Sequence, residues 1–244
     1  MAKLPPDSRW QDPELLARGI GRFAPFKCWP LPALLRLAQA GSVSSHAPGA
    51  ILIAHKRPQD VLSVVLEGAS QVTVTDAGGR RVTFIYDGST MVYGLAPLFD
   101  GEPMLHDLLA LDPVILLRIP FAAVRAELAA APALWESVGA EMCARYRRTA
   151  LQMTRFVFDS PRVHMAALLV GLAGQGADCD DPIPIDMKLP QDKLAEMLAI
   201  SRQWAAQLIR EMVDDGLLQW RYGRVTLLDP KRLRALAAES IGLP

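Results

Sequence analysis

The spacing of the apolar residues changes once along this chain, and that change limits what the chain can fold into. Between residues 46 and 120 the apolar residues stand in short runs that are separated by turn signals. Residues 71–75 alternate polar and apolar side chains, as a half-buried strand does. The runs that we expect to be strands are 50–55, 61–68, 70–76, 81–86 and 114–120. Short strands at this spacing predict an antiparallel barrel or roll.

Cap and turn signals place further elements around these strands. Asp12 and Pro13 supply an N-cap and a first-turn proline for a short helix over 13–22. A second helix over 31–40 is expected to end at Gly41. Residues 76–79 end in two glycines, which tolerate the positive φ of tight turns, so we expect a hairpin turn there.

Beyond residue 133 the apolar residues recur every three or four positions, which predicts one long helix. A helix of that length needs a partner for its apolar stripe. The partner is either the core of the same chain or a second copy of the helix in a dimer. The stripe consists of Leu134, Val138, Met142, Tyr146, Ala150, Met153 and Val157.

Residues 190–224 have the pattern of a winged helix-turn-helix. A short amphipathic helix over 191–200 is followed by Ser201 as an N-cap and by a second helix that ends at Gly216. The outer face of the second helix, in its first half, is where a recognition helix presents side chains to the major groove. That face carries Arg202, Gln203, Gln207 and Trp204. Arginine pairs with guanine and glutamine with adenine, so these residue types suit base reading.

Charge supports this interpretation only locally. Lys plus Arg and Asp plus Glu both number 26 in the whole chain, so the formal net charge is zero. Residues 188–224 carry six basic and five acidic residues, but the acids of the second helix stand at its far end, away from Arg202. Two strands after Gly216 would form a wing whose Arg221 and Arg224 can reach phosphates. The alternative is an ordinary pair of packed helices.

Several classes of protein are disfavoured by the composition. Cys28, Cys143 and Cys179 are far apart, which argues against a disulfide framework and a zinc site. No apolar run approaches the roughly 20 residues that span a bilayer, and the N-terminus lacks the apolar stretch of a signal peptide. We therefore expect a soluble, cytoplasmic protein. The sequence contains no nucleophile elbow, phosphate-binding loop or metal-ligand spacing, so we do not expect an enzyme.

Over residues 30–235 the chain resembles the Crp/Fnr family of bacterial transcription regulators. The resemblance rests on HAPGAILI, VLSVVLEGASQVTVTDAGGRRVTFI, GLAPLFDGEP, the long helix at 133–157 and SRQWAAQLIREMVDDGLLQWRYGRVTLLD. It implies an α+β protein with an antiparallel β-roll sensor domain, of the cupin-like double-stranded β-helix type, over 1–132. A dimerisation helix over 133–158 and a winged helix-turn-helix domain over 159–244 would follow. On the long helix, the expected dimer contacts are Val138, Met142, Tyr146 and Met153.

The resemblance also assigns roles to residues of the helix-turn-helix. Arg202 and Gln203 fall on base-contacting positions of the family, and Gln207 falls on a third, which is often arginine. Gln191 falls near a phosphate-contacting position, and Ser201 is the helix cap. The family usually has glycine in the turn between the helices where this chain has Ala199, so we expect some strain if that residue takes a positive φ.

The sensor domain departs from the family pattern. In members that bind cyclic nucleotides, a glutamate binds the ribose and an arginine with its small neighbour binds the phosphate. The matching positions here are Leu95, Met104 and Leu105, beside Tyr93 and Gly94. A buried phosphate without a cation or donors is unfavourable, so we expect no cyclic-nucleotide binding of the usual kind. The apolar replacements favour an apolar or aromatic effector in this pocket, whose identity the sequence does not give.

No cofactor or metal is expected. A four-cysteine iron–sulfur cluster would need more N-terminal cysteines than Cys28. A haem would need an axial ligand, and each histidine is more readily explained as a structural or exposed residue. The histidines are His46, His55, His106 and His164.

Two functions remain as hypotheses. The first is a homodimeric transcription regulator that binds a near-palindromic site on double-stranded DNA and has RNA polymerase as a further partner. The second is a small-molecule sensor that acts through protein contacts and has a degenerate DNA-reading head. The sequence favours the first.

Overall fold

The computed structural model describes residues 8–75, 78, 81–86, 92–173, 181–185 and 189–239. The chain divides into two compact units, Met1–Arg145 and Tyr146–Pro244. The boundary falls inside the long helix α5 (Trp135–Phe158). The hairpin turn expected at 76–79 lies outside the described residues except for Gly78.

The N-terminal unit begins with short helices, as the sequence predicts. They are η1 (Ser8–Gln11), α1 (Pro13–Ile20), η2 (Ala24–Phe26) and α2 (Leu31–Ala40). Asp12 caps α1 by accepting a hydrogen bond from the backbone N–H of Glu14 at 2.9 Å, which confirms the predicted N-cap. Gly41 follows the last residue of α2, as expected.

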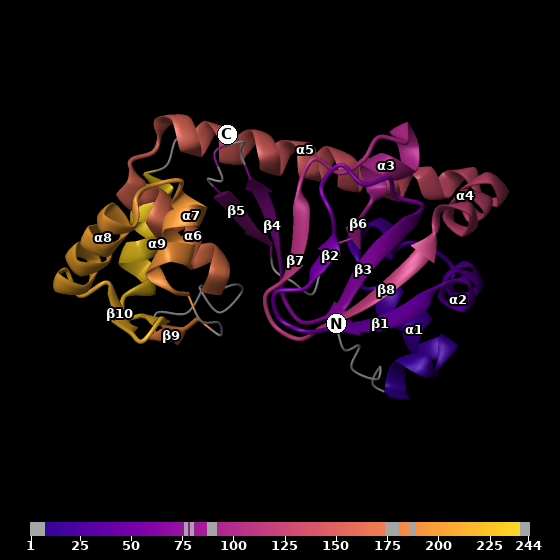
Figure 1. Ribbon diagram of the computed structural model, residues 1–244, viewed down its shortest axis with the longest axis horizontal. Helices are drawn as coiled ribbons and strands as arrows, with labels where there is room; N and C mark the ends of the chain where they lie inside the picture. Colours follow the sequence, from indigo (N-terminus) through magenta and orange to yellow (C-terminus); the bar gives the residue numbers. More distant parts are fainter. Residues whose placement is uncertain are drawn as a thin grey trace. The chain divides into compact units, whose positions relative to one another are not determined.

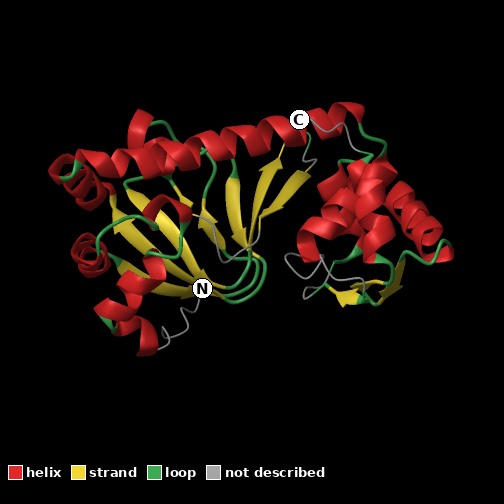
Figure 2. Ribbon diagram, turned by 180° about the vertical axis from the view of Figure 1, so that it is seen from behind, coloured by secondary structure: helices red, strands yellow, loops and turns green. Residues whose placement is uncertain are grey.

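Two four-stranded antiparallel sheets follow and form the β-roll (Figure 2). The first has the order β1 (Ser42–His46), β8 (Val114–Pro120), β3 (Val61–Glu67) and β6 (Val92–Tyr93). The second has the order β2 (Ile51–Ile53), β7 (Asp107–Ala110), β4 (Ser70–Thr75) and β5 (Arg81–Tyr86). The predicted strands are present, whereas β1, β6 and β7 were not predicted because they are short or polar.

Strand β3 shows why one run of the sequence is almost continuously apolar. Successive side chains point to opposite faces of a strand. Leu62, Val64 and Leu66 belong to a core cluster with α1, α2 and α4, whereas Val65 belongs to a second cluster between the two sheets. Both faces of β3 are therefore buried, and no polar alternation can develop.

The roll is completed by α3 (Leu95–Asp100), α4 (Phe121–Ala130) and η3 (Pro132–Leu134). Gly94 precedes α3 with φ +94°, and a Cβ there would lie 3.0 Å from the carbonyl oxygen of Val61. Only glycine fits that conformation and that space without strain. The helix that carries the predicted effector residue Leu95 thus begins tightly against β3.

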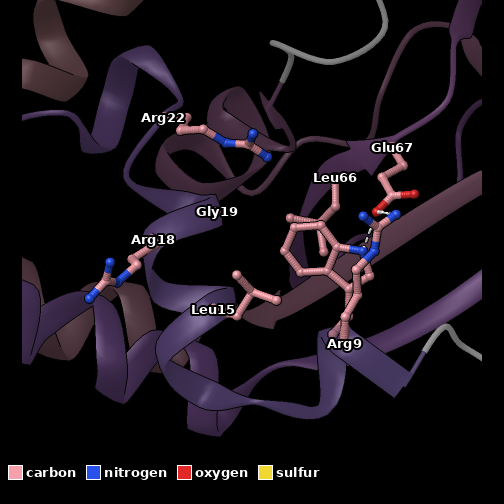
Figure 3. A pocket seen from close by; sticks show the side chains of 8 residues that line it. Arg9, Leu15, Arg18, Gly19, Arg22, Leu66 and Glu67 are labelled. Carbon is pink, nitrogen blue, oxygen red and sulfur yellow. Dashed lines mark hydrogen bonds and ion pairs between the residues drawn. The ribbon is translucent and has the colours of Figure 1, made fainter.

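An open cavity of about 410 Å³ lies between the N-terminal segment and the end of β3 (Figure 3). Glu67 joins the two sides, because it pairs with Arg9 at 2.5 Å and accepts a hydrogen bond from the indole N–H of Trp10. A Cβ on Gly19 would lie 2.9 Å from the Trp10 ring, so glycine at this position lets the indole rest on α1. The N-terminal helices are thereby fixed to the roll.

The C-terminal unit contains helices and a small sheet. The helices are the end of α5, α6 (Pro161–Ala173), α7 (Gln191–Leu198), α8 (Arg202–Asp214) and α9 (Pro230–Ala238). The sheet has the order β10 (Leu218–Arg221), β11 (Arg224–Leu227) and β9 (Ile183–Pro184), and it lies at one end of the helical group (Figure 1). Helix α9 and strand β9 were not predicted. Among the described residues, no helix combines the length and apolar character that a membrane span requires.

Candidate nucleic-acid interface

The turn between α7 and α8 is held in a strained conformation. Ala199 has φ +53°, and the backbone N–H of Ile200 donates to the carbonyl oxygen of Ala195 at 3.0 Å, which closes the end of α7. The left-handed region costs a residue with a Cβ roughly 1–2 kcal/mol. The condition under which the sequence predicts strain here, a positive φ at Ala199, is therefore met.

Helix α8 starts at the predicted cap and presents the predicted face. Ser201 Oγ accepts a hydrogen bond from the backbone N–H of Trp204 at 3.2 Å. Arg202 and Gln203 are exposed in the first turn, and Trp204 is 47% exposed. The opposite face carries the core stripe Ala205, Leu208, Ile209 and Met212. The cap thus sets the start of α8, and the stripe sets which face turns to solvent.

One of the predicted base-reading side chains already has a partner within the chain. Gln207 is exposed, and its Nε2 donates to Glu211 Oε1 at 2.9 Å, one turn further along α8. This bond uses one N–H of the Gln207 amide, so the second N–H and the amide oxygen are the groups left for base recognition. This contact was not foreseen, although the spacing of four residues could have indicated it.

The acids at the end of α8 are also partnered. Arg162 of α6 pairs with the carboxylate of Asp215 and lies 3.9 Å from that of Glu211. Arg232 donates from Nη1 to the backbone carbonyl of Asp215 at 3.2 Å. Positive side chains therefore offset the acidic end of the helix, which sequence counting over 188–224 did not reveal because both arginines lie outside that range.

The wing is a two-stranded hairpin with a two-residue turn. Arg221 pairs in register with Arg224, and both side chains are exposed. Tyr222 and Gly223 form the turn with φ values of +51° and +75°. The carbonyl oxygen of Gly223 accepts a hydrogen bond from the backbone N–H of Leu189 at 2.7 Å. The tip of the wing therefore lies against the segment that leads into α7.

The start of α7 is the remaining part of the predicted interface. Gln191 is its first residue and is half-buried. Lys193 in the same turn forms an ion pair with Glu196 at 3.2 Å, so part of its charge is offset. The structure thus brings Gln191, the wing and the exposed half of α8 together in one small domain.

The predicted effector residues do not share one environment. Leu95 is 2% exposed and packs in the cluster that the helices form on the roll, whereas Tyr93 and Met104 pack with the cluster between the sheets. Leu105 is 73% exposed. The hydroxyl of Tyr93 lies 3.1 Å from Ser70 Oγ. Ser63 Oγ has no hydrogen-bond partner among the residues that the structure describes, although Ser63 is only 1% exposed. The space between the sheets therefore contains hydroxyl groups that the sequence analysis missed.

A guanidinium reaches across the roll at another place. Arg118 of β8 donates to Ser44 Oγ at 3.1 Å and to the carbonyl oxygen of Leu52 in β2 at 3.4 Å. Burial lowers the pKa of Arg118. This cation bridges strands of both sheets, and it is not at the positions that the family uses for phosphate.

Helix α5 has some side chains that pack on its own chain and a set of large apolar side chains that are exposed. Val138 is 1% exposed in the first core cluster, and Met142 packs against that cluster. The sequence assignment of Val138 to a dimer contact is therefore wrong, because a helical stripe does not reveal which partner covers it. Tyr146 and Met153 are 76% and 65% exposed.

Two family models match the chain, one in each of its two compact units. The model of the cyclic nucleotide-binding domain matches residues 43–130, and that of the Crp-like helix-turn-helix domain matches residues 163–236. The cAMP-activated global transcriptional regulator CRP of Haemophilus influenzae is 23% identical over 158 residues, which are 64% of this chain and 70% of that protein. The global nitrogen regulator of Synechococcus elongatus is 21% identical over 179 residues, which are 72% and 81% of the two chains.

Solved structures of regulators share the fold. CLP, the c-di-GMP responsive global regulator of Xanthomonas campestris, matches with a TM-score of 0.69 and 17% identity over 82% of this chain and 99% of that one. FixK2 of Bradyrhizobium japonicum also has a TM-score of 0.69, with 13% identity over 80% and 96% of the chains.

The chain belongs to the Crp/Fnr family. As a Crp/Fnr protein it is a DNA-binding transcription regulator with a cyclic nucleotide-binding-like domain, and the interface around α8 and the wing lies in its helix-turn-helix domain. The expected fold class, with a β-roll, a long helix and a C-terminal winged helix-turn-helix, is confirmed.

Proposed function

We propose that this Crp/Fnr regulator acts as a homodimer that reads a near-palindromic operator with the first half of α8. The observation that carries the proposal is the exposed set of Arg202, Gln203 and Gln207 on a helix whose start is fixed by Ser201. A recognition helix contacts base edges with its N-terminal residues. Arg202 would pair with a guanine, and the two glutamines suit adenine.

The surrounding residues would hold this helix in register on the duplex. Arg221 and Arg224 of the wing would contact phosphates, as would Gln191 at the start of α7, and Trp204 would lie at the edge of the interface. Contacts to phosphates position a protein without reading sequence. The weak net charge of residues 188–224 is compatible with this role, because Arg162 and Arg232 lie beside the acids at the far end of α8.

The second copy would pair through the part of α5 that its own chain leaves uncovered. Tyr146, Met153 and Val157 share one face of the helix at spacings of seven and four residues, and they are 65–76% exposed. Large apolar side chains in one exposed stripe mark an interaction surface. We place the dimer contact there, between a sensor domain over 1–132 and a DNA-binding domain over 159–244.

The effector of this regulator would not be a cyclic nucleotide held in the usual way. Leu95, Met104 and Leu105 supply neither a cation nor a hydrogen-bond donor where the phosphate and ribose would lie. The relative from Haemophilus influenzae is cAMP-activated and CLP is c-di-GMP responsive, so one fold serves different ligands. The apolar side chains of Tyr93 and Met104, together with the buried hydroxyls of Ser63 and Ser70, favour an aromatic or apolar molecule that carries a hydrogen-bonding group.

The experiment is a map of the genomic fragments that the purified protein retains. A dimeric reader should retain fragments that share two inverted half-sites with centres about 10 base pairs, or a multiple of that spacing, apart. Retention that follows only fragment length would favour a sensor that acts through protein contacts. If the retained fragments shared only a single half-site, the protein would still read DNA, but the proposal that it binds as a dimer would be wrong.

A further inference from the structure

The tip of the wing carries the most exposed large hydrophobic side chain in the part of the chain that the structure describes. Tyr222 is 99% exposed, so its ring and hydroxyl pack against none of the described residues. The aromatic side chain therefore contributes no packing to the domain that carries it. A role for this residue has to come from something outside the chain.

The backbone conformation at Tyr222 is unfavourable for a tyrosine. A two-residue hairpin turn in which both residues have positive φ is a type I′ turn, which favours asparagine, aspartate or glycine. A bulky residue at φ +51° is an outlier, because its Cβ crowds the backbone. Strain of this kind gathers at functional sites, and here no contact of the side chain within the chain offsets it.

The surroundings of Tyr222 indicate which partner it meets. The exposed side chains of Arg221 and Arg224 flank it on the two strands. The hydrogen bond from Leu189 to Gly223 holds the tip against the start of α7, where Gln191 begins the helix. The tyrosine thus stands among the side chains to which we assign phosphate contacts.

We propose that Tyr222 is a DNA-contacting residue whose phenol donates a hydrogen bond to a phosphate of the bound duplex. This inference rests on the proposed function. Tyrosine is one of the side chains that donate to phosphate oxygens, and a contact of this kind carries no base information. Because the phenol is neutral, it releases no counterion when it binds, unlike the arginines on either side.

The test compares Tyr222→Phe, Tyr222→Asn and the wild-type chain on two duplexes: a fragment retained from the genome and a scrambled copy of it. Tyr222→Phe should weaken binding to both duplexes about tenfold, because a hydrogen bond to a charged group is lost. Tyr222→Asn should weaken both as well, because its amide is several ångströms shorter than the phenol and does not reach the same phosphate. The slope of affinity against salt should stay unchanged. The matched control, Arg221→Ala, should lower that slope by about 1.

A second readout separates the contact from a general loss of structure. Asparagine tolerates the left-handed region, so Tyr222→Asn should slow hydrogen exchange of the β10 and β11 amides about fivefold while it weakens DNA binding. A gain in wing stability together with a loss of affinity cannot come from damage to the fold.

Specific outcomes would overturn the inference. Wild-type affinity in Tyr222→Phe would show that the hydroxyl makes no contact. Wild-type affinity in both variants would assign the exposed ring to a protein partner instead. If the wild-type chain failed to prefer the retained fragment over its scrambled copy, the proposed base reading would fail, whereas the loss of affinity in Tyr222→Phe would still report on the phosphate contact. The two failures are therefore distinguishable.

Discussion

Arg145 in α5 donates a hydrogen bond from Nη2 to the backbone carbonyl oxygen of Val92 in β6, with 2.6 Å between the two atoms. Its Nε also donates to Glu141 at 2.7 Å, and Glu141 is only 8% exposed. Strand β6 leads directly into α3, so this arginine ties the long helix to the strand that precedes a predicted effector element. The link connects the long helix directly to the sheet of the sensor domain.

Replacing this arginine should destabilise the N-terminal unit. Arg145→Met keeps the aliphatic stem but removes the hydrogen bonds to the buried Glu141 and to the carbonyl of Val92, so we expect a loss of about 2 kcal/mol. Hydrogen exchange of β6 and α5 in the full chain measures the change. The double variant Glu141→Gln/Arg145→Met should recover part of the loss, and equal exchange in all three proteins would show that the ion pair contributes nothing.

A second ion pair predicts a dependence on pH. Arg36 donates two hydrogen bonds to Glu127, at 2.6 and 2.8 Å, and these bonds lower the pKa of the Glu127 carboxyl. A carboxyl with a lowered pKa in the folded state stabilises the protein above its unfolded pKa of about 4.3, and it loses that contribution as the pH falls further. Arg36→Met should therefore be less stable than wild type at pH 7, by an amount that solvent screening of the exposed arginine keeps small. The difference from wild type should shrink between about pH 4 and pH 2, and a constant difference in urea unfolding would contradict this account.

The strained turn in the helix-turn-helix gives a stabilising variant. Ala199→Gly removes the Cβ at φ +53°, so the C-terminal unit should gain about 1 kcal/mol. Ala206→Gly, within α8, is the matched control and should cost about 1 kcal/mol, because glycine weakens a helix interior. Thermal unfolding measures the stability of both variants relative to the wild-type chain. A loss of stability in Ala199→Gly would mean that the turn does not store strain.

The two parts of α5 should respond differently to charge. Tyr146→Glu or Met153→Glu should dissociate the dimer in sedimentation without unfolding the chain, because both side chains are exposed within one copy. Val138→Glu should unfold the N-terminal unit instead, since it buries a charge without a partner. A wild-type chain that sediments as a monomer at micromolar concentration would remove the dimer from the account.

The side chains at the phosphate-binding positions predict that cyclic nucleotides do not bind, and restoring the family's residues there provides a positive control. Calorimetry with cAMP or cGMP should detect no binding at micromolar concentration, because positions 104 and 105 carry Met and Leu. Met104→Arg with Leu105→Ser restores the side chains that the family resemblance assigns to the phosphate, and it should raise affinity if the rest of the scaffold is intact. Micromolar binding by the wild-type chain would contradict the prediction.

Much of the fold was predictable because it depends on local patterns. The cap at Asp12 and the cap at Ser201 each follow from residue types within a few positions. The order of roll, long helix and helix-turn-helix follows from periodicity together with the family resemblance. Strands β1 and β6 were missed, because five partly polar residues and two residues respectively are too short to show a period.

The site was less predictable where it depends on contacts distant in sequence. The link between Arg162 and Asp215 spans 53 positions, so no window of sequence could place a positive charge beside the end of α8. The hydroxyl of Ser63 inside the roll depends on which face of β3 turns inward, and that face is ambiguous when both are buried. Val138 was assigned to a dimer contact because the apolar stripe of a helix does not show whether its own chain or a second copy covers it.

The most direct test of the central claim measures the affinity of Arg202→Ala for a retained operator and for its scrambled copy. The claim is that α8 reads bases, so this variant should lose about 1–3 kcal/mol of preference at one base position while its affinity for scrambled DNA changes much less. Arg221→Ala should weaken both duplexes about equally. If Arg202→Ala weakened the two duplexes by the same factor, Arg202 would be a phosphate contact, and the account of α8 as the reading helix would be contradicted.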